Sequence, residues 1–377
     1  MTSRELGCIA RRRNDGAAAP VQFPVGRRAL LVAAAAATTL SRPARAADPI
    51  AAATITPQGG MVAGRARPGP WRIGFADGFG GSAWRTMCLA AIRQEAAARP
   101  QQIAQLLVRD AQGNIGQQIR DIRDLIRARV DALLCIATSR DALTAVLAEA
   151  TAQGIVTVPF NLPVEGEAWS TYVATDPVQK GHALGTWLAG ALGGRGQVVG
   201  LGGLPGNPYS VATWSGAQAA FRGSGLQVLV FADGWWQRDR ARAVMAGLIG
   251  AFPVIQGVWC DGGQDAAGAT EALLAARRPL VPVTGDDNNG LLKLYAALAG
   301  RNPGFSFALL SEPSWQGVIA LRAALTLLGG GSVPKRQIVL PAPITPANYR
   351  QFIRPTLPDP VLVDTALDDA TLARIFR

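Results

Sequence analysis

The chain has 377 residues, of which 49% are hydrophobic and 17% are charged, so it is long and apolar enough to bury a sizeable core. Its formal net charge of +11 would suit a nucleic-acid-binding protein, but residues 1–46 contain eight Arg and two acidic residues and account for +6 of it. The remaining +5 is scattered, with no basic run interleaved with aromatic residues, so we expect no nucleic-acid partner.

The first element predicted in chain order is an export signal. A twin arginine at 27–28 precedes an apolar stretch at 29–40 and a small-residue pattern, Ala-Arg-Ala, at 44–46. These three parts are typical of a signal peptide cleaved near Ala46, and the twin arginine indicates the bacterial pathway that carries folded proteins. The alternative is a membrane anchor, but the apolar stretch is too short to span a bilayer. We therefore expect a periplasmic protein.

The rest of the chain alternates between strand-like and helical patterns. Residues 47–70, rich in Ala, Gly and Pro, are predicted to be a flexible linker. Strands are expected at 71–77, 103–111, 131–137, 155–161, 170–176, 197–203, 226–233, 254–260, 280–285, 305–311 and 336–343. Helices are expected at 83–99, 115–128, 142–154, 178–192, 211–221, 240–250, 266–277, 291–300 and 315–328. This alternation is typical of parallel sheets covered on both faces, and the number of units suits two sheets in tandem.

One polar segment, GDDNNG at 285–290, follows an expected strand and precedes an expected helix. Its contiguous side chains do not match the alternating ligands of a calcium loop. Asp and Asn cap helices, and the carboxyl edge of a parallel sheet is where ligands bind. Both roles are compatible, and a paired-carboxylate acid/base site is a third interpretation.

The sequence contains no clear metal or cofactor motif. Cys88, Cys135 and Cys260 remain after the signal and lack C-x-x-C spacing, so we expect buried free thiols, although one bridge is an alternative. The one histidine, His182, lies in a helical pattern and is interpreted as structural or surface-exposed. The Gly-rich segment 200–205 matches neither phosphate-loop pattern. We expect no metal, no cofactor and no catalytic residue.

Aromatic and polar side chains follow several of the expected strands. Trp84 and Trp236 occupy such positions, whereas the Trp residues at 71, 169, 187 and 259 are expected to pack in the core. A sugar ring offers apolar faces to flat aromatics and hydroxyls to Asp and Asn. The strand ends therefore favour a sugar-like ligand.

Three stretches, at 110–161, 172–192 and 281–294, make the chain resemble the ribose-type periplasmic sugar-binding proteins, the substrate-binding components of ATP-binding-cassette importers. The resemblance covers about residues 71–345. It implies the α/β fold of type I periplasmic binding proteins, in which two similar doubly wound parallel-sheet lobes are joined by a three-segment hinge. The N-terminal lobe is then expected at 71–175 plus 311–340, and the C-terminal lobe with the tail at 176–310 plus 341–377.

The resemblance also implies a ligand site between the lobes, with Trp84 and Trp236 as the two aromatics. The full set of expected ligand-binding residues is Ser82, Trp84, Arg85, Asn161, Trp236, Asp261, Asp287 and Glu312. Two family arginines are missing, because Leu162 and Thr213 stand at their positions. A neutral polyol or another sugar therefore suits the chain as well as ribose does.

The function implied is that of an extracytoplasmic solute-binding protein, a monomer that delivers a sugar or polyol to the membrane permease of an importer. One alternative is a ligand-binding sensor for a chemoreceptor or kinase. Another is a secreted carbohydrate hydrolase, which would need two carboxyl groups such as those of Asp286 or Asp287 with Glu312.

Overall fold

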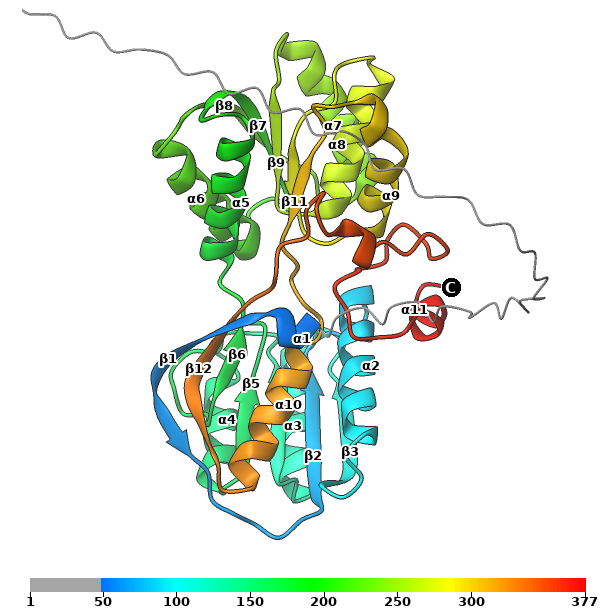
Figure 1. Ribbon diagram of the computed structural model, residues 1–377. Coiled ribbons are helices and arrows are strands. Elements are labelled where there is room, and N and C mark those ends of the chain that lie inside the picture. The colour runs from blue at the N-terminus through cyan, green and yellow to red at the C-terminus, as the bar shows by residue number, and fades with distance from the viewer. Residues whose placement is uncertain (1–48) are drawn as a thin grey trace, which may run out of the picture. The chain divides into compact units, whose positions relative to one another are not determined.

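The computed structural model describes residues 49–377, so the expected export signal lies outside the described residues. The described chain folds into two α/β lobes, each built on a parallel sheet (Figure 1). No helix among residues 49–377 is long and apolar enough to cross a membrane.

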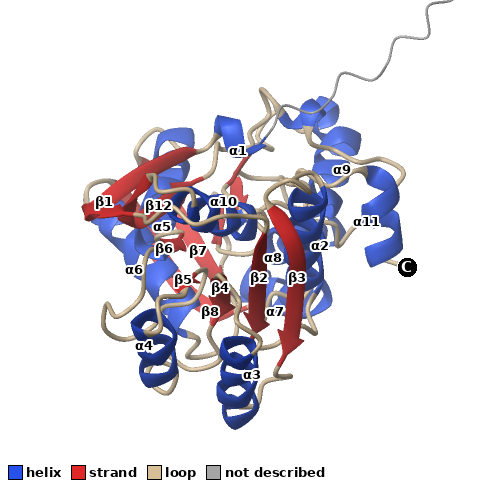
Figure 2. Ribbon diagram, turned by 90° about the horizontal axis from the view of Figure 1, so that it is seen from below, coloured by secondary structure: helices blue, strands red, loops and turns tan. Residues whose placement is uncertain are grey.

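The N-terminal lobe contains a four-stranded sheet in the order β3-β2-β4-β5. Its strands are β2 (Trp71–Asp77), β3 (Ile103–Asp110), β4 (Ala132–Ile136) and β5 (Val156–Pro159), all parallel. Alternate strand residues face two separate clusters of buried side chains, Leu134 one and Leu133 the other, as the period of two requires. Helices cover both faces: α2 (Ala83–Ala97) packs with α10 (Gln316–Leu328), and α3 (Ile115–Arg127) packs with α4 (Thr144–Ala152) (Figure 2).

The C-terminal lobe contains a five-stranded sheet in the order β11-β10-β9-β7-β8. Its strands are β7 (Arg195–Gly202), β8 (Gly225–Asp233), β9 (Gly257–Cys260), β10 (Val283–Gly285) and β11 (Phe307–Leu309). Its helices are α5 (Pro177–Ala191), α6 (Pro208–Arg222), α7 (Arg238–Ala251), α8 (Gly263–Ala275) and α9 (Asn289–Leu298), followed by the short 3-10 helix η1 (Ala299–Arg301). The alternation predicted from the sequence is therefore confirmed in both lobes.

The linker predicted at 47–70 is wrong over most of its length. Residues Pro49–Ala52 form the short helix α1, and Thr54–Ala63 form strand β1. β1 is antiparallel to β12 (Ser332–Leu340), which in turn runs parallel to β6 (Tyr172–Ala174). Nine of the ten β1 residues are exposed, so the strand lacks the apolar alternation that would have revealed it. Backbone hydrogen bonds to β12, and not the burial of a hydrophobic face, hold β1 in place.

The sequence predicts no helix after β12, but the structure contains two. It contains the 3-10 helix η2 (Tyr349–Gln351) and the helix α11 (Asp369–Ile375), with irregular segments between them. Ile344 pairs with Leu309 of β11, which extends the edge of the C-terminal sheet by an isolated bridge.

Several smaller expectations are also confirmed. Cys88, Cys135 and Cys260 are buried and unbridged, and burial raises the pKa of the Cys88 and Cys135 thiols to about 12. Trp259 is fully buried in the core, and His182 is exposed on α5.

Close contact between α5 and α6 depends on two glycines. A Cβ atom at Gly181 of α5 would lie 1.8 Å from the carbonyl oxygen of Thr213, and one at Gly216 of α6 would lie 2.0 Å from that of Val178. Both neighbours are helix backbone, so neither can move aside without separating the helices. The two positions therefore set the distance between the helices that cover this face of the sheet.

We predict that Gly181→Ala lowers the free energy of unfolding by about 3 kcal/mol or more, because the added methyl group overpacks a rigid contact. Gly190→Ala, in the same helix with nothing within 4 Å of its Cβ position, should instead stabilise the protein by up to about 1 kcal/mol. Urea unfolding followed by circular dichroism compares the two variants. Equal effects would contradict the role given to the α5–α6 contact.

Candidate functional site

The carboxylate of Glu312 joins groups from both lobes. Glu312 lies in the segment that connects β11 of the C-terminal lobe to α10 of the N-terminal lobe. Its carboxylate accepts hydrogen bonds from Asn161 Nδ2 at 2.9 Å, Gln316 Nε2 at 2.6 Å, Thr175 Oγ1 at 2.6 Å and Tyr209 OH at 3.4 Å. Hydrogen bonds to a charged acceptor are stronger than neutral ones, so this carboxylate is a centre of polar organisation between the lobes.

Two residues predicted for the N-terminal lobe reach this centre. Trp84, in the first turn of α2, donates its indole N–H to the Glu312 carbonyl oxygen at 2.6 Å. Asn161 follows β5 and has a φ of +64°, a left-handed conformation that Asn tolerates better than most residues. The structure thus brings Trp84, Asn161 and Glu312 together.

The other two residues predicted for this lobe, Ser82 and Arg85, lie at the start of α2. Arg85 pairs with Asp77, the last residue of β2, at 2.7 Å, and burial raises the pKa of Asp77 despite this partner. Ser82 caps α2 by accepting a hydrogen bond from the backbone N–H of Arg85. Ser82 is exposed and makes a local contact that a helix N-cap alone explains.

In the C-terminal lobe, Asp261 and Trp236 contact each other. Asp261 follows β9, and its carboxylate accepts hydrogen bonds from Trp236 Nε1 at 2.9 Å and Ser210 Oγ at 2.7 Å. Thr213 Oγ1 donates a third hydrogen bond to the same carboxylate, at 3.3 Å. Thr213 stands at one of the two positions where the resemblance leads us to expect an arginine. Burial raises the pKa of Asp261, and the three donors oppose that rise.

The Trp235-Trp236 pair adopts an uncommon backbone. Both residues have positive φ, +68° and +54°, which is a genuine outlier for bulky side chains. The Trp236 indole packs over Gly203, where a Cβ atom would lie 2.0 Å from the ring. Strained residues of this kind concentrate at ligand sites, where the surrounding structure holds them in place.

A buried lysine, which no pattern in the sequence indicates as a site residue, lies beside these residues. Lys180, in α5, is 3% exposed, and its ammonium group donates to Tyr209 OH at 2.9 Å. The Tyr209 hydroxyl is also 3.4 Å from Glu312, so Lys180, Tyr209 and Glu312 form a chain of polar contacts. The positive charge of Lys180 lowers the pKa values of Asp261 and Asp286, which burial raises.

The polar segment at 285–290 divides its side chains between two directions. Asp286 accepts a hydrogen bond from the backbone N–H of Gly263 and interacts electrostatically with Lys180, Asp261 and Glu312, while burial raises its pKa to about 6. Asp287 is 2% exposed and accepts instead from the backbone N–H of Asp364, at 2.7 Å. The structure therefore places the Asp286 carboxylate against Gly263 in the polar cluster. The carboxylate of the predicted Asp287 bonds to the tail instead, although the charge of Lys180 lowers its pKa as well.

The capping interpretation of the same segment is confirmed. Asn288 is the N-cap of α9, and its side chain accepts a hydrogen bond from the backbone N–H of Leu291 at 3.0 Å. The helix begins at Asn289, two residues before the predicted start.

We name the side chains gathered here the interlobe cluster. Its members are Trp84, Asn161, Thr175, Lys180, Tyr209, Trp236, Asp261, Asp286 and Glu312. They come from the carboxyl ends of strands, the first turns of helices and the connecting segments, where ligands bind in open α/β sheets. Among residues 49–377 no group of three or more His, Cys, Asp or Glu side chains is arranged to hold a metal ion.

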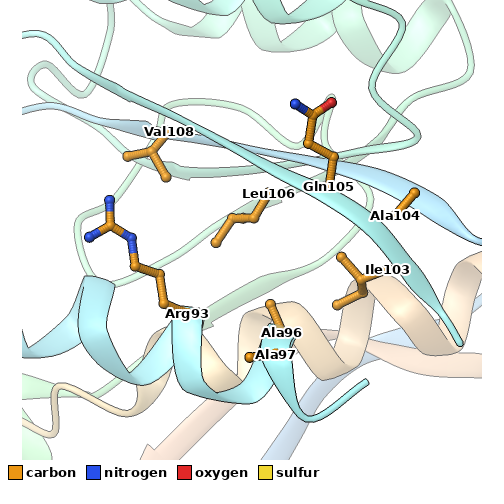
Figure 3. A pocket seen from close by; sticks show the side chains of 8 residues that line it. All are labelled: Arg93, Ala96, Ala97, Ile103, Ala104, Gln105, Leu106 and Val108. Carbon is orange, nitrogen blue, oxygen red and sulfur yellow. The ribbon is translucent and has the colours of Figure 1, made fainter. Parts of the chain in front are cut away.

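A separate pocket of about 420 Å³ lies between α2 and the edge strand β3 (Figure 3). Its lining combines aliphatic side chains, among them Ile103, Leu106 and Val108 of β3 facing the helix, with the polar side chains of Arg93 and Gln105. It contains none of the interlobe cluster.

Two α/β lobes with a polar and aromatic cluster at their connecting segments define a class, the two-lobed binding proteins. The chain belongs to the periplasmic binding protein family, because the family's domain model matches residues 73–332. It is similar to the ribose import binding protein RbsB of Bacillus subtilis, with 29% identity over 244 residues, 65% of this chain and 77% of that one. It is also similar to a xylitol-binding protein of Mycolicibacterium smegmatis, with 29% identity over 48% of this chain and 53% of that one.

Solved structures share the fold. A Caulobacter myo-inositol binding protein superimposes with a TM-score of 0.61 and 21% identity, over 76% of this chain and 97% of that one. The fructose binding periplasmic domain of a hybrid two component system superimposes with a TM-score of 0.60 and 23% identity, over 74% and 92% of the two chains. The fold expected from the sequence is thus confirmed, and these relatives are binding proteins.

We predict that Asp286→Asn raises the free energy of unfolding at pH 7 by about 1 to 2 kcal/mol, because one pKa unit is worth about 1.4 kcal/mol. The pKa of Asp286 is raised from 3.8 to about 6, so its stabilising contribution is full below pH 4 and is lost as the pH rises through 6. The two proteins should therefore differ most above pH 6 and least near pH 4. Thermal unfolding across this range measures the difference, and a gap that widens toward pH 4 would contradict it.

Proposed function

We propose that the interlobe cluster binds a sugar or polyol and that closure of the two lobes buries it. This proposal rests on the combination of two indole rings, those of Trp84 and Trp236, with both hydrogen-bond donors and hydrogen-bond acceptors. Asp286, Asp261 and Glu312 supply acceptors, and Asn161 supplies a donor. Hydroxyl groups donate and accept, so a polyhydroxylated ligand can use both kinds of partner.

The relatives support this ligand class. The names of the similar proteins refer to ribose and xylitol, and those of the similar structures to myo-inositol and fructose. These ligands share a compact carbon skeleton with several hydroxyl groups. We propose that the solute of this protein belongs to the same chemical class.

We further propose that Lys180 is a ligand-binding residue. An ammonium group carries three N–H donors, and among the described residues one side-chain partner, Tyr209, is within hydrogen-bonding distance. The buried charge also lies beside Asp261 and Asp286, which hold it electrostatically. Lys180 would then supply the cationic donor that the missing arginines at positions 162 and 213 do not.

Closure would depend on the segments that connect the lobes. We propose lobes of 71–175 plus 311–340 and of 176–310 plus 341–377, with β1 added to the first lobe through its pairing with β12. Glu312 and Thr175 then lie at two of the three crossings. A hinge at these residues would couple ligand contact directly to domain closure.

For the partner, we propose the membrane permease of an ATP-binding-cassette importer, with the protein acting as a periplasmic monomer and without catalysis. The relatives named as import binding proteins support this choice. A sensor role is the second candidate, favoured by the similarity to a periplasmic domain of a two component system. Pull-down of the closed, ligand-bound protein with either a permease or a receptor kinase would distinguish the two.

We predict that residues 47–377 bind at least one of ribose, xylitol, myo-inositol or fructose in isothermal titration calorimetry. Asp286→Ala should weaken the binding at least tenfold, because a hydrogen bond to a charged group contributes about 1.5 to 3 kcal/mol. Asp239→Asn, which alters an exposed carboxylate of α7, is the matched control and should bind as the unchanged protein does. Binding of amino acids but of no sugar or polyol would overturn the ligand class.

We predict that Lys180→Met weakens the same binding by about tenfold or more and that Lys180→Arg weakens it less, because Arg keeps the charge. Loss of the ammonium group should also raise the pKa of Asp286, which is faced by Lys180, Asp261, Glu312 and the Gly263 N–H. The acidic limb of the binding curve should therefore move to higher pH. Calorimetry between pH 5 and 8 tests this, and an unmoved limb would exclude direct coupling of Lys180 to the site.

A further inference from the structure

The C-terminal tail, residues 345–377, is bound first to the start of α9. The Asn289 amide donates to the carbonyl oxygens of Arg354, Leu357 and Pro358, at 2.8 to 3.1 Å, and its Oδ1 accepts from the Arg354 N–H at 2.9 Å. Asn289 is fully buried, so these bonds satisfy a polar group that would otherwise be costly to bury. One side chain of the GDDNNG segment thus holds a turn of the tail.

Charged groups add a second anchor at Asp359. The Asp359 carboxylate pairs with Arg238 of α7 at 2.6 Å and with Lys293 of α9 at 3.0 Å, and these bonds lower its pKa. Its backbone carbonyl accepts from the Gly290 N–H at 3.0 Å. The tail is therefore attached to α7 and to the start of α9, directly after the loop that carries Asp286.

The next anchor lies beside a lobe crossing. The Asp364 N–H donates to Asp287, and the Asp364 carboxylate accepts from the hydroxyl of Ser311, the residue before Glu312. All three residues are buried. The tail thereby contacts both the Asp286 loop and the segment that carries Glu312.

The last anchor is on the other lobe. Helix α11 packs against α2, as Figures 1 and 2 both show, and Leu372 of α11 is fully buried. Ile375 and Phe376 are partly buried against the same core. Because α2 carries Trp84 and Arg85 in its first turn, the tail reaches from the Asp286 loop to the helix that bears the opposite aromatic.

We propose that the C-terminal tail is a positioning strap for the ligand site. It fixes the Asp286 loop through Asn289 and Asp287, and it joins the two lobes a fourth time through α11. Such a connection limits how far the lobes open. It also keeps the carboxylates of Asp261 and Asp286 at a defined separation from Trp84 of α2 before the ligand arrives, which lowers the entropic cost of ordering the site on binding.

The test compares Leu372→Asp, which places a charge in the α11–α2 contact, with Ala370→Asp on the exposed side of the same short helix. In the ligand-free protein, the Leu372 variant should show a larger radius of gyration by small-angle X-ray scattering and faster amide exchange in α2. The Ala370 variant should match the unchanged protein in both. Leu372→Met should leave the radius of gyration and the amide exchange rate as in the unchanged protein, since a residue of similar volume keeps the contact.

Two further measurements cover the loop and the ligand. Asp359→Asn removes the ion pairs without touching the core, and it should increase amide exchange at residues 286–292 while Asp239→Asn does not. Only the effect of the strap on affinity rests on the proposed function. For the ligand found by calorimetry, Leu372→Asp should weaken binding about three- to tenfold. Equal scattering and exchange for the Leu372 and Ala370 variants would overturn the strap, whereas the absence of any ligand would overturn only the proposed function.

Discussion

The interlobe cluster depends on one carboxylate, that of Glu312, and on where the chain places it. It stands on a segment that passes between the lobes, and it accepts hydrogen bonds from residues that follow β5, β6 and β7 as well as from α10. A charge in this position needs several donors, because water is partly excluded. The donors come from both lobes, so satisfying this one charge also aligns the groups around it.

In the C-terminal lobe, the site brings several buried carboxylates together around one cation. Asp261, Asp265 and Asp286 are close together in sequence or space, and burial raises the pKa of each. Lys180 is the cation that opposes this rise for Asp261 and Asp286. Buried charges and the strained backbone of the two Trp residues therefore lower the free energy of unfolding, but they keep these groups where a ligand can contact them, as is common for binding sites.

The regular part of the fold could be predicted because β-strands and helices repeat with periods that apolar residues reveal. The positions of the side chains in the site could be predicted less well from the sequence. Asp286 and Asp287 are neighbours, and only the path of the turn after β10 decides that Asp286 accepts from Gly263 while Asp287 accepts from Asp364. Lys180 itself occupies a helical position in the sequence, and the Tyr209 hydroxyl that it contacts belongs to another helix, so the sequence pattern does not reveal this contact.

The segments that could not be predicted, β1 and the tail, are ordered by contacts with residues far away in the sequence. Thr54 is paired with Leu340, so the sheet that contains β1, β12 and β6 can form only when nearly the whole chain is available. On the ribosome, this edge of the protein would stay unpaired until synthesis ends, and final folding would be post-translational. The twin-arginine route expected from residues 27 and 28 moves chains that have already folded, and a late-completing sheet is compatible with that order of events.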